Sequence, residues 1–268
     1  MSAQATEFQA FTLDLGGARI AGQRAGAGPG MVLVHSLLAD SSSFLPVAQR
    51  LAQSHDVVLL DLPGFGLSDP IDGGIEAMAD RLAETVRALG LTEAPTLLGN
   101  GYGGFITLLC YIRHPGIARK LILADCGAVF SEPGRAAFRG MSANAREKGL
   151  AAISDVAMRR LFSPEFQALH PELIAERKAR FLQTDLGTFH RACASLATLD
   201  LSASLPLVDV PAWVLAGALD EATPPAMSEA LAAGLPRAQL KILPGCAHVP
   251  QLQAPEQFMQ AIAQALSA

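Results

Sequence analysis

The chain has 268 residues, of which 50% are hydrophobic and 17% are charged, and its formal net charge at pH 7 is −5. This composition supplies enough apolar surface for a large core, which excludes the disordered and fibrous classes of protein. The negative charge and the lack of a basic stripe argue against nucleic acid or an acidic membrane as a partner.

The chain opens without a recognisable targeting segment. The residues MSAQATE lack the charged and apolar regions of a signal peptide, and no apolar run approaches the length of a bilayer span. The four cysteines are far apart and form neither a CxxC pair nor zinc-finger spacing; they are Cys110, Cys126, Cys193 and Cys246. Such usage is typical of reduced thiols, so we expect a cytoplasmic protein without a disulfide framework.

The pattern of hydrophobic residues predicts a mostly parallel sheet. Residues 8–25 alternate and are interrupted by Gly16 and Gly17, which indicates an antiparallel hairpin at the sheet edge. Nearly all-apolar runs then alternate with helical patterns, as expected of strands covered on both faces. The runs are residues 31–35, 57–61, 96–99, 121–125, 213–217 and 240–243. One helix is predicted by the stripe of Ile75, Ala79, Leu82, Val86 and Leu89.

The alternation stops after Cys126. Residues 129–206 contain no strand-like run, only helical segments separated by glycine and proline. An insertion between two parallel strands lies over their carboxyl ends, where open α/β sheets bind ligands, so we interpret it as a lid. Helices packed on the flank of the sheet would give the same pattern. The sequence predicts a core of residues 1–128 and 207–268 and a helical lid of residues 129–206.

The strongest local motif is LLGNGYGGF at residues 97–105, a strand that runs into a glycine-rich turn and then a helix. It fits a nucleophile elbow, GxSxG, with Gly101 where serine is usual. It also fits the GxGxxG of a dinucleotide site, with Asp125 about twenty residues later. The dinucleotide motif follows the first strand of its domain, whereas at least two parallel-type strands precede this one. The elbow is therefore the favoured interpretation.

Two later residues complete the chain order of a hydrolase triad: Asp220, at the end of one strand, and His248, after the next. We expect His248 to act as the base and Asp220 to hold its imidazole. An oxyanion hole needs only backbone N–H groups, here those of Tyr102 and Leu37.

On these residues the chain resembles an α/β hydrolase throughout, and within that superfamily it resembles the 3-oxoadipate enol-lactone hydrolases. General similarities are VHSL at residues 34–37, DLPGFGLS at 61–68 and the elbow. Closer similarities are LFSPEF at 161–166, HRACASL at 190–196, LDL at 199–201 and GALDEATPP at 217–225. The resemblance implies an α/β-hydrolase fold, with a mostly parallel eight-stranded sheet, helices on both faces and a helical lid. It also implies hydrolysis of a small carboxylic ester or (enol-)lactone without a metal or organic cofactor.

The chain departs from this family at Gly101, where those enzymes place the serine that forms an acyl-enzyme. Glycine relieves the strained backbone of an elbow, so the residue also has a purely structural explanation. Ser36 stands where glycine is more usual after His35 and adds a hydroxyl at the mouth of the pocket. Because Ser36 follows a different strand, we expect that it is not presented to His248.

Four residues are candidates for contacting the substrate: Ser36, His190, Cys193 and Asp125. His190 and Cys193 match the lid segment of the resembled family, although a surface histidine and a packed thiol fit equally well. Asp125 ends a strand near the elbow and is either an alternative acid to Asp220 or an ordinary turn residue. Candidates for holding a substrate carboxylate are the lid arginines Arg135, Arg139 and Arg146.

Three functions stay open for a His–Asp dyad without the usual serine. The first is hydrolysis of an ester or lactone, with the dyad as general acid and base. The second is a cofactor-free lyase or oxygenase in which the dyad takes a proton from the substrate. The third is a catalytically silent ligand-binding protein. We expect a small-molecule substrate and neither a nucleic-acid nor a membrane partner. The sequence is compatible with a homodimer.

Overall fold

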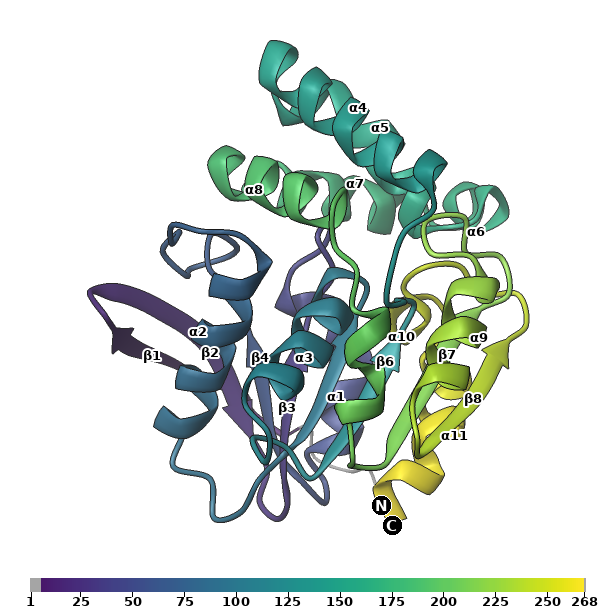
Figure 1. Cartoon of the computed structure of the whole chain (residues 1–268). Helices are drawn as coiled ribbons and strands as arrows, with labels where there is room; N and C mark the ends of the chain where they lie inside the picture. The colour runs from purple at the N-terminus through teal and green to yellow at the C-terminus, as the bar shows by residue number, and fades with distance from the viewer. Residues whose placement is uncertain (1–5, 268) are drawn as a thin grey trace.

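The computed structural model describes residues 6–267, which form one eight-stranded sheet with helices on both faces (Figure 1). The hairpin of β1 (Gln9–Leu15) and β2 (Ala18–Ala25) is antiparallel and lies at one edge. The parallel strands are β3 (Gly30–Val34), β4 (Asp56–Leu60), β5 (Thr96–Asn100), β6 (Lys120–Ala124), β7 (Ala212–Gly217) and β8 (Ala238–Leu243). Their order, β1-β2-β4-β3-β5-β6-β7-β8, confirms the predicted fold class.

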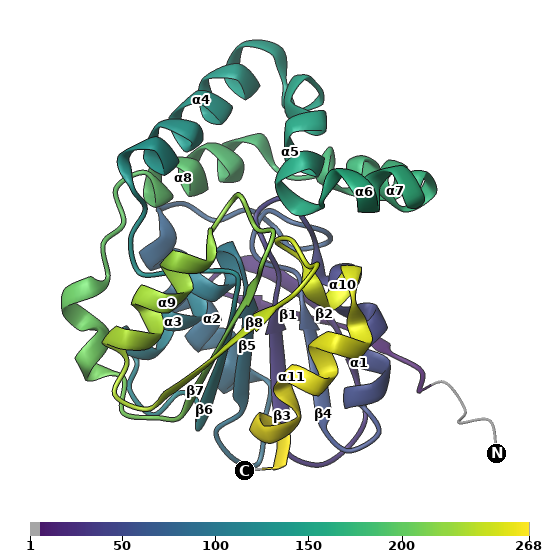
Figure 2. The same ribbon diagram turned by 90° about the vertical axis from the view of Figure 1, so that its right-hand side faces the viewer.

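Two apolar layers cover the sheet (Figure 2). On one face lie α2 (Ile75–Ala88), α3 (Tyr102–Arg113) and α9 (Pro225–Gly234). On the other face lie α1 (Leu45–Leu51) and α11 (Pro255–Ser267), with the short α10 (Pro250–Gln253) beside them. Every residue of β3, β5, β6 and β7 is buried, which explains why these strands are apolar at almost all positions.

Five α-helices lie between β6 and β7 in the chain, and we refer to them as the lid. They are α4 (Glu132–Lys148), α5 (Ser154–Leu161), α6 (Pro164–Leu169), α7 (Pro171–Phe181) and α8 (Leu186–Leu196). Both views place them beyond the carboxyl ends of the parallel strands (Figures 1 and 2). An isolated antiparallel bridge between Val129 and Asp200 joins the two segments that connect the lid to the sheet. The division into core and lid domains at residues 129 and 206 stays a prediction, and the core residues 1–5 and 268 lie outside the described part of the chain.

Polar contacts hold the lid against the core. Asp40, in the loop after β3, pairs with Arg177 at 3.3 Å and with Arg180 at 3.0 Å, both on α7. The hydroxyl of Ser195 on α8 accepts the N–H of Ile75 at 3.0 Å, which satisfies a free donor at the start of α2. The lid is therefore closed over the sheet edge.

Candidate active site

The turn between β5 and α3 has the geometry of an elbow. Gly101 lies between the strand and the helix with φ +54° and ψ −120°, a region that residues with a Cβ rarely adopt. A Cβ on Gly103 would lie 2.1 Å from the carbonyl oxygen of Val34 on β3. These glycines are thus explained by backbone conformation and by the close approach of α3 to β3, so the turn needs no bound dinucleotide.

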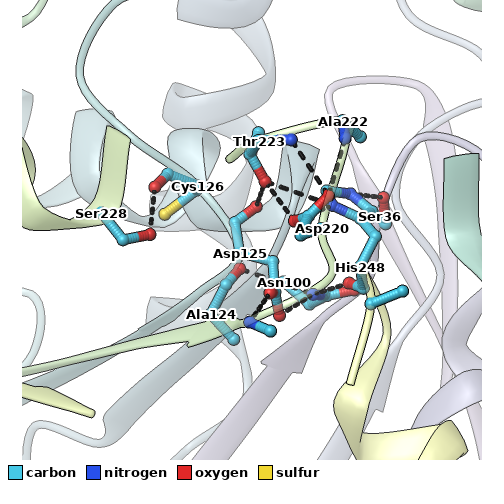
Figure 3. Close-up of polar contacts among 12 residues, drawn as sticks. Ser36, Asn100, Ala124, Asp125, Cys126, Asp220, Ala222, Thr223, Ser228 and His248 are labelled. Atoms are coloured by element: carbon cyan, nitrogen blue, oxygen red, sulfur yellow. Dashed lines mark hydrogen bonds and ion pairs between the residues drawn. The ribbon is translucent and has the colours of Figure 1, made fainter. Parts of the chain in front are cut away.

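His248 and Asp220 form the predicted pair (Figure 3). Nδ1 of His248 lies 2.8 Å from Oδ2 of Asp220, whose side chain is fully buried. The other carboxylate oxygen accepts the N–H groups of Ala222, at 2.7 Å, and Thr223, at 3.1 Å. Burial alone would raise the pKa of Asp220, but His248 and Thr223 hold it below its usual value. An ionised Asp220 keeps the proton of His248 on Nδ1, which leaves the lone pair on Nε2 free to accept.

Ser36 lies at that free nitrogen, contrary to our expectation. Its Oγ is 3.2 Å from Nε2 of His248 (Figure 3). The expectation was wrong because β3 and β5 are paired neighbours in the sheet, so the residues that follow both strands meet at one edge. Gly101 also leaves the space open, since a Cβ there would lie 2.5 Å from Ser36 Oγ and 2.5 Å from Nε2.

His35 fixes the backbone of Ser36. Its Nε2 accepts the N–H of Leu62 at 3.1 Å, so its proton is on Nδ1, which donates to the carbonyl oxygen of Ser36 at 2.9 Å. Burial lowers the pKa of His35, which keeps the ring neutral. His35 therefore positions the loop and does not face the reacting atoms.

The backbone of His248 is held from two sides. Nδ2 of Asn100 donates to the carbonyl oxygen of His248 at 2.8 Å, and Gln251 in turn donates to Asn100 Oδ1 at 3.1 Å. The N–H of His248 donates to the carbonyl oxygen of Leu161 on α5 at 3.2 Å. His248 thus has one anchor in the core and one in the lid. Sequence reasoning missed Asn100, although it occupies the variable position before the elbow residue.

Two residues that line this space have backbone N–H groups without an acceptor in the described part of the chain. Tyr102 is the first residue of α3, where the N–H has no acceptor within the helix. Neither the N–H of Tyr102 nor that of Leu37 donates a hydrogen bond to another residue in the described part of the chain. Both residues line the cavity at His248, so these groups are available for the predicted oxyanion hole.

The cavity at the dyad is small and largely apolar. Its volume is about 30 Å³, which admits roughly two water molecules. The apolar lining comes from the core and the lid, and comprises Leu38, Phe105, Phe130, Phe138, Met141 and Leu196. A substrate of even a few carbon atoms requires the lid to open or the side chains to rearrange.

Arg160 is a lining residue that sequence reasoning missed. It belongs to α5, and its guanidinium carbon lies 5.7 Å from the ring centre of Phe138. Within the described residues it has no ion pair and no hydrogen bond, and burial lowers the pKa of its guanidinium. A half-buried guanidinium that forms no ion pair with a neighbouring carboxylate is suited to binding an anion. In the sequence its only signal is its place directly before the LFSPEF match.

The three arginines that we named as carboxylate binders have other surroundings. Arg135 donates to the carbonyl oxygen of Phe130 at 3.0 Å, and Arg139 pairs with Glu132 on the surface of the lid. Arg146 lines a second hollow, between α4 and α8. These residues therefore do not line the cavity at His248 in this closed conformation.

His190 and Cys193, predicted to contact the substrate, also lie outside the lining of that cavity. His190 is hydrogen-bonded through Nδ1 to Ser142 Oγ at 2.9 Å, between α8 and α4. Cys193 is buried beside the second hollow, and burial raises the pKa of its thiol to about 12. Both residues join lid helices to each other, because their side of α8 packs against α4.

Asp125 is likewise not a lining residue, and it is not the acid that contacts His248. Its carboxylate accepts the N–H of Gly217 at 2.7 Å and the amide of Asn100 at 3.3 Å (Figure 3). Burial, followed by the nearby charge of Asp220, raises its pKa well above the usual value. Asp125 has a positive φ of 51° and connects the ends of β5, β6 and β7 beneath the dyad.

Residues 6–267 contain neither a metal-binding cluster nor a helix that could cross a membrane. No group of three or more His, Cys, Asp or Glu side chains in this range is arranged to hold a metal ion. No helix in the same range combines the length and the apolar character that a bilayer-spanning segment requires.

Comparison with known proteins supports the fold and the resemblance. The chain is 29% identical over 252 residues to the polyketide synthase ThaQ of Burkholderia thailandensis. The aligned region covers 92% of this chain but only 12% of the synthase. It is 24% identical over 236 residues to 3-oxoadipate enol-lactonase 2 of Acinetobacter baylyi, with 87% of each chain covered. A thermophilic esterase from Thermogutta terrifontis superimposes with a TM-score of 0.87 at 29% identity, covering 97% of this chain and 98% of that one. Residues 31–261 match the model of the Alpha/beta hydrolase family, and the chain belongs to that family.

Proposed function

We propose that the protein hydrolyses a small carboxylic ester or lactone, with His248 as general base and acid and Asp220 as the group that orients it. The observation that carries the proposal is the 2.8 Å contact between Asp220 and Nδ1 of His248, which leaves Nε2 for the substrate. The cavity at His248 is also lined by Leu37 and Tyr102, whose N–H groups have no acceptor among the described residues. Base, orienting acid and oxyanion donors are the parts that acyl transfer requires.

The relatives support this substrate class. One is named an enol-lactonase and one an esterase, and both match nearly the whole chain. Both reactions break an acyl C–O bond through a tetrahedral anion, which the N–H groups of Leu37 and Tyr102 would stabilise. Arg160 further favours a substrate that carries a carboxylate at a distance from the reacting carbonyl.

The proposal is tested by measuring the hydrolysis of p-nitrophenyl acetate, p-nitrophenyl butyrate and a small enol-lactone. We expect His248→Ala to lower kcat/KM by about 10³-fold or more, since the variant loses the base and the proton donor. The matched control is His114→Ala, because His114 lies on the surface and pairs with Asp80 at 2.7 Å. Turnover that survives in His248→Ala would exclude the dyad. Ligand binding without any turnover would favour the silent binding protein instead.

A further inference from the structure

The hydroxyl of Ser36 lies beside the space that the side chain of an elbow serine would occupy. A Cβ built on Gly101 would be 2.5 Å from both Ser36 Oγ and His248 Nε2, so the hydroxyl already fills the space next to the base. Ser36 is nearly fully buried, and its Oγ lies on the lining of the same cavity as His248. Gly101, after β5, has no hydroxyl, but Ser36, after β3, places one next to the same histidine.

The hydrogen-bond pattern gives this hydroxyl a direction. The proton on Nδ1 of His248 points to Asp220, so Nε2 can only accept. Within the described residues Ser36 Oγ has no partner other than Nε2, at 3.2 Å, which makes the hydroxyl the donor. Ser36 therefore contacts His248, and His248 contacts Asp220, which is the order of contacts that activates a serine nucleophile. The distance between Ser36 Oγ and Nε2 is long for a hydrogen bond, as is common before a substrate binds.

We propose that Ser36 is the nucleophile of this enzyme, in place of the residue at position 101; the inference rests on the proposed hydrolase function. Ser36 Oγ attacks the carbonyl carbon while its proton moves to His248 Nε2, and the carbonyl π electrons move to the oxygen. The N–H groups of Leu37 and Tyr102 stabilise the resulting oxyanion. The bond to the leaving oxygen then breaks, and that oxygen takes the proton from His248, which leaves an acyl group on Ser36.

Water completes the cycle. It attacks the acyl carbon and gives a proton to His248 Nε2, the C–Oγ bond breaks, and Ser36 Oγ regains the proton. The sum is ester plus water to acid plus alcohol, so the cycle needs no other reactant. His35 supports both halves as a positioning residue, because its Nδ1–H holds the carbonyl oxygen of Ser36 at 2.9 Å.

The test is covalent labelling with diethyl p-nitrophenyl phosphate, followed by mass spectrometry of the intact protein and of its peptides. We expect one diethylphosphoryl group on Ser36 in the wild type, and none in Ser36→Ala or His248→Ala. The matched control is Ser43→Ala, because Ser43 is buried in the same loop and its hydroxyl has no partner in the described structure. Label on another residue, or undiminished label in Ser36→Ala, would overturn the inference.

Ester hydrolysis separates this inference from the function on which it rests. We expect Ser36→Ala and Ser36→Gly, the second guarding against a folding defect, to lose about 10³-fold or more in kcat while Ser43→Ala keeps the wild-type rate. If turnover needs His248 but survives in both Ser36 variants, the dyad acts directly on water and only the Ser36 inference fails. If the wild type shows no His248-dependent turnover, the hydrolase proposal fails, and the site of labelling still decides whether Ser36 is the nucleophile.

Discussion

At position 101 the absence of one side chain determines what its neighbours can do. The φ of +54° suits glycine, and the space that a Cβ would fill is taken up by Ser36 Oγ and His248 Nε2. Placing serine at this position would require both neighbours to move. The substitution that removes the usual nucleophile therefore also admits another hydroxyl to the base.

Arg160 offers a second test at the scale of a single residue. We expect Arg160→Met to raise KM about 10- to 100-fold for a monoester of a dicarboxylic acid, because a charge-assisted hydrogen bond contributes about 1.5–3 kcal/mol. The KM for a neutral ester of the same length should not change. Steady-state kinetics on the two esters measures the difference.

The matched control for this test is Arg139→Met, since Arg139 pairs with Glu132 on the surface of the lid. It should leave both KM values unchanged. An equal rise for the charged and the neutral ester in Arg160→Met would mean that Arg160 shapes the pocket without binding a carboxylate.

At the scale of the elements, the loop after β3 and α7 are joined by charged side chains. Asp40 accepts from Arg177 and Arg180, and Arg177 is almost fully buried. Burial would raise the pKa of Asp40, but the Ser42 hydroxyl and the two guanidinium groups hold it below the usual value. The ionised form of Asp40 therefore stabilises the folded protein and the closed position of the lid.

We expect Asp40→Asn to lower the free energy of unfolding by about 1–3 kcal/mol at pH 7, because the buried positive charge of Arg177 then loses one of its negative partners. Since the folded pKa of Asp40 is lowered, its stabilisation is present above the unfolded value near 3.8 and is lost as the pH falls through the folded value. The difference between wild type and variant should thus shrink in acid. Urea unfolding between pH 3 and pH 7 measures it.

The control for the lid contact is Asp155→Asn, which removes an exposed ion pair with Lys178 between α5 and α7. Exposed pairs of this kind contribute little, so the unfolding midpoint should stay at the wild-type value. A pH-independent loss in Asp40→Asn would show that the ionisation of Asp40 does not stabilise the lid contact.

At the scale of the whole molecule, one of the two apolar layers shares no residue with the lining of the cavity at His248. The layer formed with α1 and α11 lies on one face of the sheet, whereas the lid lies beyond the strand ends (Figure 2). Phe258 on α11 is fully buried in this layer and does not line the cavity.

We expect Phe258→Ala to lower the free energy of unfolding by about 3–5 kcal/mol, the range for a buried aromatic side chain that leaves a cavity. The KM of the folded fraction should be unchanged, since Phe258 is not among the residues that line the cavity at His248. Urea unfolding and ester kinetics on the same preparation measure both quantities. A large change in KM would indicate that α11 positions the site.

The sequence by itself determined the elements and the order of the chemical groups. Apolar runs mark strands that are buried on both faces, and the observed strand ends lie within two residues of the predicted ones, as at residues 31–35 against Gly30–Val34. Asp220 and His248 were found because each follows a strand, and the ends of parallel strands meet at one sheet edge. The positions of the strands and the order of these two residues depend on local hydrophobic pattern and on chain order, and both can be read from the sequence.

Only the tertiary structure decided which side chains meet. Ser36 reaches His248 because β3 pairs with β5 and because Gly101 leaves room, which are facts of strand order and of atomic contact. Arg160 lines the cavity, whereas His190 turns toward α4, because the rotation of each lid helix about its axis is set by packing across the lid. Distances between residues far apart in the chain arise from packing, so the order of residues in the sequence could predict the contact of His248 with Asp220 but not its contact with Ser36.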